Sequence, residues 1–367
     1  MQYRKLGRLG ETSALGFGCM RLPTSEDGKI KREEAISLIR KGIDSGITYV
    51  DTAWTYHGGE SEVVVGLALK DGYREKVTLV TKCPVGHSSF TKPEDFDRFL
   101  DEQLTRLDQD SVDIYLLHAL NKNSYDEKVV KLNLVERAMK AKAEGKIKHL
   151  GFSFHDPPEV LKEIIDSGDF ELMLVQYNIV DQVNHEMINY AGEKGLAVAI
   201  MGTVGGGRLA GASLPDEMKQ WLTPGRSNFV DLSFKYVLSN PNVSVALSGM
   251  GSDEMLDDNL NLASRDDYNQ MSEDEKQSID GIAMRFKELC DNICTQCKYC
   301  QPCPNEVNIS FIFSSLQRHQ IYGDVEKAKY NYSVIGKMPW AQGENASACV
   351  ECGECLEKCP QGIEIID

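Results

Sequence analysis

Eight short apolar runs, rich in β-branched residues, recur through the first 285 residues of this chain, and longer segments separate them. The runs are SALGFGCM, ITYVDTA, VTLVTK, VDIYLLH, KHLGFSF, LMLVQYN, LAVAIMG and VSVALSG. Two of the intervening segments, residues 31–46 and 126–145, carry apolar side chains at helical spacing and end in glycine. Alternating strands and helices predict the parallel sheet of an α/β protein, and eight such units in about 250 residues predict a (β/α)8 TIM barrel.

A doubly wound open sheet is the alternative arrangement of these strands and helices. That fold places a G-x-G-x-x-G motif after an early strand, because the glycines let the backbone approach a pyrophosphate. The segment GRLGETSALGFG, residues 7–18, does not contain the motif. The pattern therefore favours the barrel.

Composition and charge limit the partners of the chain. Of its 367 residues, 26% are charged and 41% are hydrophobic, which is typical of a globular protein with one large core and a smaller module. The net charge of −16 repels the phosphate backbone of nucleic acids. No apolar run approaches the ~18 residues that a membrane span requires, and the first residues show no apolar segment of a secretory signal. We therefore expect a cytoplasmic protein without nucleic-acid or membrane partners.

The cysteines divide the chain, since nine of the eleven lie between Cys290 and Cys359. This change in composition predicts a boundary near residue 285, with a barrel over residues 1–285 and a small, mainly helical domain over residues 286–367. Just before it, the motif SEDE at 272–275 and the spaced apolar residues that follow predict a capped helix. Because disulfides are disfavoured in the cytoplasm, clustered cysteines there more often bind metal.

Four polar residues lie at the ends of the second, third and fourth apolar runs or just after them: Asp51, Tyr56, Lys82 and His118. The carboxyl ends of barrel strands meet at one mouth, where barrel enzymes carry their catalytic groups. A tyrosine hydroxyl with an ordinary pKa near ~10 is a poor acid, but a nearby ammonium lowers that pKa. A carboxylate orients the lysine, and a histidine can donate to a substrate oxygen. The set suits protonation of a carbonyl oxygen, with a nicotinamide cofactor as the hydride source.

In their order and in their local motifs, VDTAWTYHGGES, TLVTK and IYLLH, these four residues resemble the catalytic tetrad of the aldo-keto reductases. The resemblance extends over nearly the whole barrel. It implies that Tyr56 is the general acid, that Lys82 and Asp51 tune it, and that His118 orients the carbonyl. The chain is then an NAD(P)-dependent oxidoreductase that reduces a small carbonyl compound to an alcohol, or catalyses the reverse.

The resemblance also implies a cofactor site, with departures from the family pattern. Ser153 stands where the family holds the nicotinamide amide, but the asparagine that usually follows is Phe154. The family's glutamine falls on Leu174, and Gln176 is a candidate replacement because it lies two residues on, on the same face of a strand.

The loops after the seventh and eighth runs are candidates for the pyrophosphate and the rest of the dinucleotide, because barrel phosphate sites commonly lie there. In NADP-preferring relatives an arginine stands where this chain has Met255, so the choice between NADH and NADPH stays open. The candidate residues in the two loops are Gly205, Gly206, Gly207, Arg208, Ser248, Gly249, Ser252 and Asn259.

The run CVECGECLEKCP has the C-x2-C-x2-C-x3-C-P spacing of bacterial ferredoxins, and CTQCKYCQPCP has the same form with one residue fewer before its last cysteine. In such pairs three cysteines of one run and the last cysteine of the other hold each [4Fe–4S] cluster. Zinc is the alternative, and the short Cys300–Cys303 gap leaves one cluster or two open. The tail resembles the ferredoxin-type domain of one branch of the aldo-keto reductases. The two expected ligand sets are Cys294, Cys297, Cys300 and Cys359, and Cys349, Cys352, Cys355 and Cys303.

A hydride carries two electrons, whereas iron–sulfur clusters pass one electron at a time. A chain with both can couple the carbonyl reaction to a one-electron carrier protein, or the clusters can only brace the fold. A second interpretation, from another class, is an electron-transfer or redox-sensing protein whose barrel binds nicotinamide without turning over a carbonyl. The substrate-facing loops, residues 83–90 and 118–128, show no charge pattern that identifies a substrate.

Overall fold

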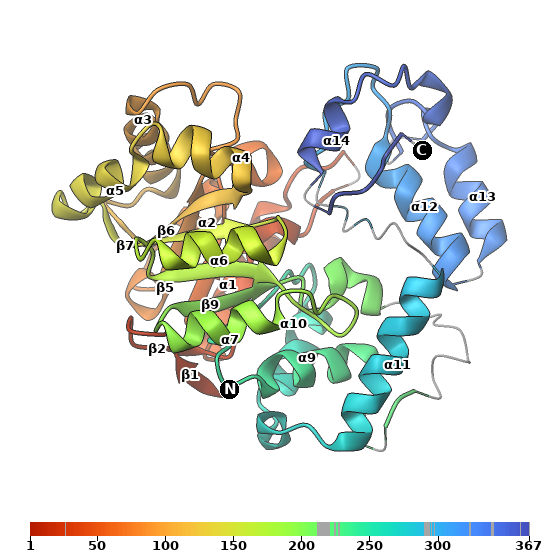
Figure 1. Ribbon diagram of the computed structural model, residues 1–367, viewed down its shortest axis with the longest axis horizontal. Coiled ribbons are helices and arrows are strands. Elements are labelled where there is room, and N and C mark those ends of the chain that lie inside the picture. Colours follow the sequence, from red (N-terminus) through yellow and green to blue (C-terminus); the bar gives the residue numbers. More distant parts are fainter. Residues whose placement is uncertain are drawn as a thin grey trace. The chain divides into compact units, whose positions relative to one another are not determined.

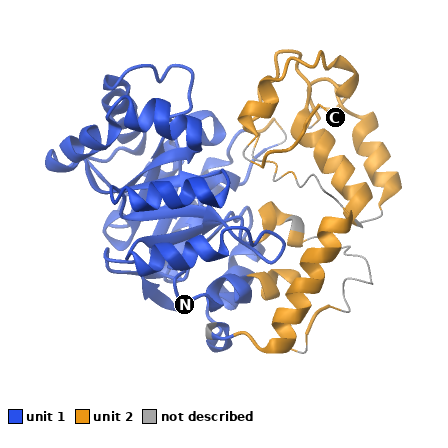
Figure 2. Cartoon of the chain, in the orientation of Figure 1, with its two compact units in different colours: residues 1–25, 29–203, 234–270 blue, residues 26–28, 204–233, 271–367 orange. Residues whose placement is uncertain are grey.

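The computed structural model describes residues 1–367 except 26, 211–220, 224, 227, 290–293, 295, 297, 323, 339–340, 360 and 367, and the side chains at 208, 269 and 322 (Figure 1). The chain forms two compact units (Figure 2). The first contains residues 1–25, 29–203 and 234–270, and the second contains residues 26–28, 204–233 and 271–367. Among the described residues, no helix combines the length and the apolar character needed to cross a bilayer.

Within the first unit, eight described strands pair in parallel and close into a barrel, in the order β10-β3-β4-β5-β6-β7-β8-β9. Each strand falls on one of the eight apolar runs, with β5, β6 and β7 extending one or two residues beyond the run, so the predicted (β/α)8 barrel is confirmed and the open sheet is excluded. The strands are β3 Leu15–Gly18, β4 Tyr49–Asp51, β5 Thr78–Cys83, β6 Val112–Leu120, β7 Ile147–Phe154, β8 Leu172–Gln176, β9 Ala197–Met201 and β10 Val245–Ser248.

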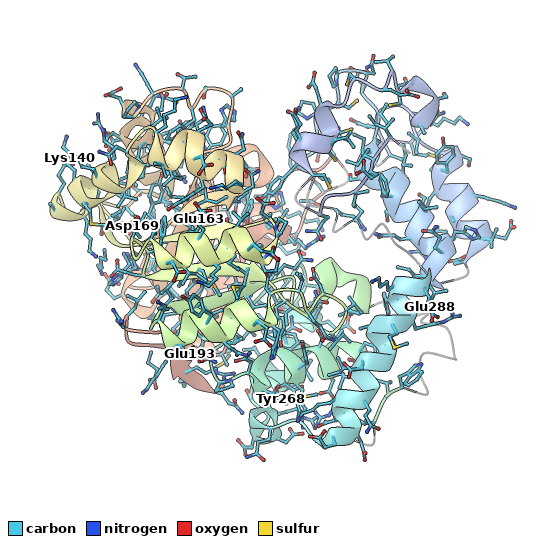
Figure 3. The ribbon with its side chains drawn as sticks, viewed as in Figure 1. Lys140, Glu163, Asp169, Glu193, Tyr268 and Glu288 are labelled. Carbon is cyan, nitrogen blue, oxygen red and sulfur yellow. The ribbon has the colours of Figure 1, made fainter. Side chains whose placement is uncertain are left out.

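Helices surround these strands and turn charged side chains outward, among them Lys140, Glu163 and Glu193 (Figure 3). The segment expected to be one helix over 126–145 is divided, because a π-helical turn, Tyr125–Val130, and a left-handed residue, Asn133, precede the α-helix. The helices are α1 Arg32–Asp44, α2 Glu60–Ala68, α3 Glu94–Leu107, α4 Lys122–Ser124, α5 Leu134–Ala143, α6 Pro158–Asp166, α7 His185–Glu193, α9 Phe229–Ser239 and α10 Asp253–Leu262.

The interior of the barrel explains how the strands present polar residues at its mouth. Side chains of a strand alternate between two faces, so residues two apart point the same way. Tyr49, Val80, Leu116 and Leu174 lie together in the buried core cluster, and Leu6 joins them from a hairpin of β1 Tyr3–Lys5 and β2 Glu11–Ser13. Two residues further along the strands lie, in the same order, Asp51, Lys82, His118 and Gln176.

The second unit is mainly helical, as expected. Its helices are α11 Glu273–Leu289, α12 Ile309–Tyr322, α13 Val325–Ser333 and α14 Glu354–Lys358. The predicted capped helix is α11: the amide of Glu275 donates to the hydroxyl of Ser272, and the amide of Ser272 donates to the carboxylate of Glu275. This helix runs through residue 285, and the boundary expected there stays a prediction.

Close packing between α2 and α3 gives a test of the fold. A Cβ on Gly66 would lie 2.2 Å from the backbone oxygen of Leu107, which ends α3. We predict that Gly66→Ala lowers the free energy of unfolding by ~1–3 kcal/mol, because the two helices must move apart. Chemical denaturation measures the loss. The matched control is Gly86→Ala, where an added Cβ meets nothing within 4 Å and the change should stay within about 0.5 kcal/mol.

Candidate functional site

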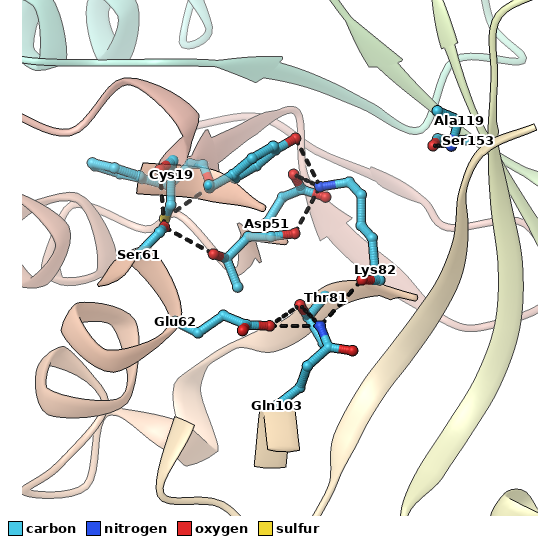
Figure 4. A network of polar contacts seen from close by, with 12 residues as sticks. Cys19, Asp51, Ser61, Glu62, Thr81, Lys82, Gln103, Ala119 and Ser153 are labelled. Atoms are coloured by element: carbon cyan, nitrogen blue, oxygen red, sulfur yellow. Dashed lines mark hydrogen bonds and ion pairs between the residues drawn. The ribbon is translucent and has the colours of Figure 1, made fainter. Parts of the chain in front are cut away.

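Lys82 lies at the centre of the barrel mouth, with its side chain 1% exposed. Its Nζ donates to Oδ1 of Asp51 at 2.5 Å, to the backbone oxygen of Thr52 at 2.7 Å and to the hydroxyl of Tyr56 at 3.1 Å (Figure 4). The three hydrogens of the ammonium group therefore each have an acceptor. The structure brings the predicted aspartate, tyrosine and lysine into one hydrogen-bonded group.

His118 completes the predicted quartet. Its ring meets the ring of Tyr56 edge to face, with centroids 6.1 Å apart, and the residue is buried. Burial, Lys82 and His155 lower the pKa of His118 well below its usual 6.5, so the imidazole is neutral near neutral pH. Burial raises the pKa of Asp51, and the neighbouring Lys82 opposes that rise. A neutral imidazole can donate a hydrogen bond to an oxygen, which leaves Tyr56 as the group suited to release a proton.

A bulge in β6 places His118, and sequence reasoning missed it. The register between β6 and β7 shifts between Leu117 and Leu120, and Ala119 takes a left-handed conformation with φ of 54°. The amide of Ala119 donates to Oγ of Ser153 at 2.7 Å. Ser153 is buried, and the hydrogen bond from Ala119 uses only the acceptor capacity of its hydroxyl.

The remaining barrel residues expected to hold the cofactor lie at the ends of β8 and β10. Leu174 is in the apolar core, whereas Gln176 is the last residue of β8 and donates Nε2 to Asp181 at 2.6 Å. Asn259, on α10, donates Nδ2 to Oγ of Ser248 at 3.0 Å, and Ser252 caps that helix.

The candidate cofactor loops contain an arginine neighbour and three glycines with positive φ. Arg21, which sequence reasoning missed, lies against Gly249: a Cβ on that glycine would be 3.0 Å from the side chain of Arg21. Gly205, Gly206 and Gly207 belong to the second compact unit, and all three have positive φ, a conformation that glycine adopts without strain. The side chain of Arg208 lies outside the description.

The cysteines of the second unit line two cavities. Four of them, Cys303, Cys349, Cys352 and Cys355, line a cavity of about 110 Å³ that Cys300 also borders. Cys294, Cys300 and Cys359 line a smaller cavity of about 20 Å³, and Cys297 lies outside the described residues. None of the cysteines that the structure describes forms a disulfide.

Corresponding described residues of the two cysteine runs have the same backbone conformation. Gln296 and Glu351, each two residues after the first cysteine of its run, have φ of 55° and 54°. Their amides donate to the sulfur atoms of Cys294 and Cys349 at 3.3 and 3.4 Å. Among the described residues, no three His, Cys, Asp or Glu side chains are placed to hold a single metal ion.

A closed (β/α)8 barrel that carries Asp51, Tyr56, Lys82 and His118 together is typical of a class of barrel oxidoreductases. The chain belongs to the aldo/keto reductase family, whose sequence pattern matches residues 14–283, and residues 293–364 match a 4Fe-4S dicluster domain. The expected resemblance to both is thereby confirmed.

Three relatives illustrate the similarity. The holo form of the aldo-keto reductase AKR11C1 from Bacillus halodurans is 27% identical, with a TM-score of 0.66 over 77% of this chain and 96% of that one. An aldo-keto reductase from Klebsiella pneumoniae in complex with NADPH is 25% identical, with a TM-score of 0.63 over the same shares. The NADH-specific methylglyoxal reductase of Escherichia coli is 28% identical over 58% of this chain and 68% of the relative. Among curated relatives, the match spans from 62% to 96% of the relative's own length.

Two histidines with lowered pKa values, His118 and His155, predict how stability depends on pH. Burial lowers the pKa of His155 from 6.5 to about 4, and the pKa of His118 is also below 6.5. The unfolded chain therefore binds protons that the folded chain does not, so stability is full above pH 6.5 and falls as the pH drops toward 4. Denaturant unfolding across this window measures the slope. His155→Asn should flatten the slope, and an unchanged slope would contradict the assignment.

Proposed function

We propose that this chain reduces a small carbonyl compound to an alcohol, or catalyses the reverse, with Tyr56 as the general acid. The observation that carries the proposal is the ammonium group of Lys82, held by buried Asp51, 3.1 Å from the hydroxyl of Tyr56. An ammonium at that distance favours the phenolate, and it makes the phenol a better proton donor.

Each residue of the quartet has a role in this reaction. When bound, a nicotinamide cofactor supplies the hydride that the carbonyl carbon receives. Tyr56 gives its hydroxyl proton to the carbonyl oxygen, and the electrons of the broken O–H bond remain on the phenolate. Lys82 stabilises that phenolate, and Asp51 keeps Lys82 in place. His118, as a neutral imidazole, donates a hydrogen bond that orients the carbonyl oxygen.

The chain has groups suited to a nicotinamide dinucleotide, which supports the proposed cofactor. The hydroxyl of Ser153 has a proton to donate to the amide oxygen, and Gln176 ends a strand at the mouth. Positive-φ glycines at 205–207 can expose backbone amides to a pyrophosphate, with Arg208 adding charge. The remaining contacts are assigned to Ser248, Gly249, Ser252 and Asn259. One relative is named NADH-specific and another was solved with NADPH, so both cofactors belong in the assay.

The cysteine-rich unit is proposed to hold two [4Fe–4S] clusters. The larger cavity brings together the four cysteines assigned to one cluster, including Cys303, which crosses over from the other run. Cys294, Cys300 and Cys359 line the second cavity, and Cys297 would complete that set. Assembled clusters supply one-electron transfer, which would couple the carbonyl reaction to a one-electron carrier protein.

An electron-transfer or redox-sensing protein remains the second candidate function. The observation that favours it is Phe154, which stands in place of the family's asparagine and removes one expected contact with the nicotinamide amide. The exposure of Cys349 and Cys352 would place a cluster near solvent, which suits electron transfer under either candidate. Carbonyl turnover in the anaerobic protein, assayed against a panel of carbonyl compounds with NADH and with NADPH, separates the two candidates.

Tyr56→Phe tests the acid role. The variant removes only the hydroxyl, so we expect carbonyl reduction to fall by ~10²–10⁴-fold while cofactor affinity is kept. Steady-state kinetics and a fluorescence titration with the cofactor measure the two effects. The matched control is Tyr73→Phe, whose hydroxyl bonds Asp44 on the surface. Unchanged turnover in Tyr56→Phe would remove Tyr56 from the mechanism.

Iron and sulfide analysis of protein prepared without air tests the clusters. Two clusters would give about eight irons per chain, and one would give about half as many. We expect Cys359→Ser to perturb the cluster of the 294–300 run and Cys303→Ser to perturb that of the 349–355 run, since the fourth ligand crosses over. EPR after reduction distinguishes the two. Stoichiometric zinc without iron would overturn the assignment.

A further inference from the structure

A second buried polar network lies next to Asp51, Tyr56, Lys82 and His118, and none of the catalytic roles proposed above belongs to it. Its centre is Glu62, a residue of α2 that is 0% exposed. Its Oε1 accepts from the hydroxyl of Thr81 at 2.6 Å and from Nε2 of Gln103 at 2.6 Å (Figure 4). Its Oε2 pairs with the guanidinium of Arg106 at 3.3 Å. Burial raises the pKa of Glu62, and these partners oppose the rise.

Arg106 connects this carboxylate to the loop that carries Tyr56. Its guanidinium donates to the backbone oxygen of Trp54 at 3.2 Å and lies over the indole ring, 5.1 Å from the centroid. A Cβ on Gly59 would be only 2.5 Å from the same guanidinium. Arg106 therefore touches the loop on both sides of Tyr56, two residues before it and three residues after it.

The backbone of this loop needs external support. His57, Gly58 and Gly59 follow Tyr56 with φ of 50°, 65° and 93°, three left-handed residues in succession. A residue with a Cβ, such as His57, adopts that conformation only at an energetic cost, because its Cβ approaches the following carbonyl oxygen. Such a conformation persists when the surrounding contacts impose it. The contacts of Arg106 supply such a constraint.

The same network also holds Lys82, the partner of Tyr56 in the contact between ammonium and phenol. Nε2 of Gln103 also donates to the backbone oxygen of Lys82 at 3.1 Å, and Oε1 of Gln103 accepts from the hydroxyl of Tyr115 at 2.7 Å. Through Gln103, Glu62 is tied to the backbone of Lys82, and through Arg106 it is tied to the backbone beside Tyr56. One buried carboxylate thus links both partners of the 3.1 Å contact between the ammonium and the phenol.

We propose that Glu62 and Arg106 are positioning residues that set the distance between Tyr56 and Lys82. The inference rests on the proposed function, since it gives the pair a role through the general acid. Neither residue needs to touch the substrate or the cofactor. When the pair is weakened, the loop moves away from Lys82, the phenolate loses the support of the ammonium, and Tyr56 ionises at a higher pH.

Two variants weaken the pair in different ways. Arg106→Lys keeps a positive charge, but a point-like ammonium cannot reproduce the planar fork that reaches both Glu62 and Trp54. Glu62→Gln keeps the shape and removes the charge that anchors Arg106. Both avoid leaving an unpaired charge in the core, which full removal of Arg106 would do and which can unfold a protein. Gln103 and Thr81 stay in place in both variants.

Two controls separate positioning from a loss of surface charge. Glu102→Ala removes the other carboxylate that Arg106 contacts and leaves the contacts with Glu62 and Trp54. Arg137→Ala removes an arginine that pairs with Glu94 and Asp97 of α3. Neither control should change the pH at which Tyr56 ionises.

The main measurement is the ionisation of Tyr56, followed by tyrosinate absorbance as the difference between each protein and the same protein carrying Tyr56→Phe. We expect Arg106→Lys and Glu62→Gln to shift this ionisation to higher pH. For the carbonyl reaction we expect kcat to fall on the order of 10²-fold, with the basic limb of the pH profile moving in parallel and KM changing less. Ionisation of Tyr56 at the wild-type pH in both variants would overturn the proposal.

The experiments distinguish a failure of the proposed acid role from a failure of the positioning role. If Tyr56→Phe keeps full carbonyl turnover, the acid role is lost, but the absorbance titration still reports whether Glu62 and Arg106 control the phenol. If Tyr56→Phe is inactive and the controls shift the ionisation as much as Arg106→Lys does, the acid role stands and the positioning role is wrong.

Discussion

The ion pair between Lys82 and Asp51 is the interaction on which the candidate site depends. Both side chains are almost completely buried, where an unpaired charge would be strongly destabilising. The pair is tolerated because all three hydrogens of the ammonium have acceptors, one of which is the phenol of Tyr56. The same positive charge helps to keep His118 neutral. One buried cation therefore contacts the tyrosine directly and lowers the pKa of the histidine.

The barrel supplies the rigid support that this pair requires. Asp51 and Lys82 extend from neighbouring strands, β4 and β5, whose inward side chains continue the apolar core below them. Ser61 and Glu62, at the start of α2, add a layer of buried hydrogen bonds to Thr52 and Thr81. The polar residues of the mouth thus lie directly above the apolar core. A small shift of α2 or α3 would therefore move the residues that contact Asp51 and Lys82.

The second unit, which contains the two cysteine runs, has a different kind of core from the barrel. One of its buried core clusters is small and combines Cys300 with the aliphatic and aromatic residues Val307, Ile309, Phe313 and Ile363, while further cysteines pack at its edge. A core of this size contributes little stability alone, and binding of a metal group to cysteines adds directly to folding free energy. A left-handed residue stands two positions after Cys294 and again two positions after Cys349. Cluster assembly and folding of this unit are therefore expected to be coupled.

The sequence by itself determined the eight strands, because short apolar runs alternate with helical segments, and it put Asp51, Lys82 and His118 at the ends of three runs. The C-x2-C spacing of the two cysteine runs identified the 4Fe-4S dicluster domain, while the pairing of its ligands stays a prediction. Only the tertiary structure decided that Leu174 lies in the core, that Ala119 forms a bulge beside Ser153, and that Glu62 meets Arg106. These contacts join residues as much as 44 positions apart, and hydrogen bonds between distant segments leave no periodic signal in a sequence.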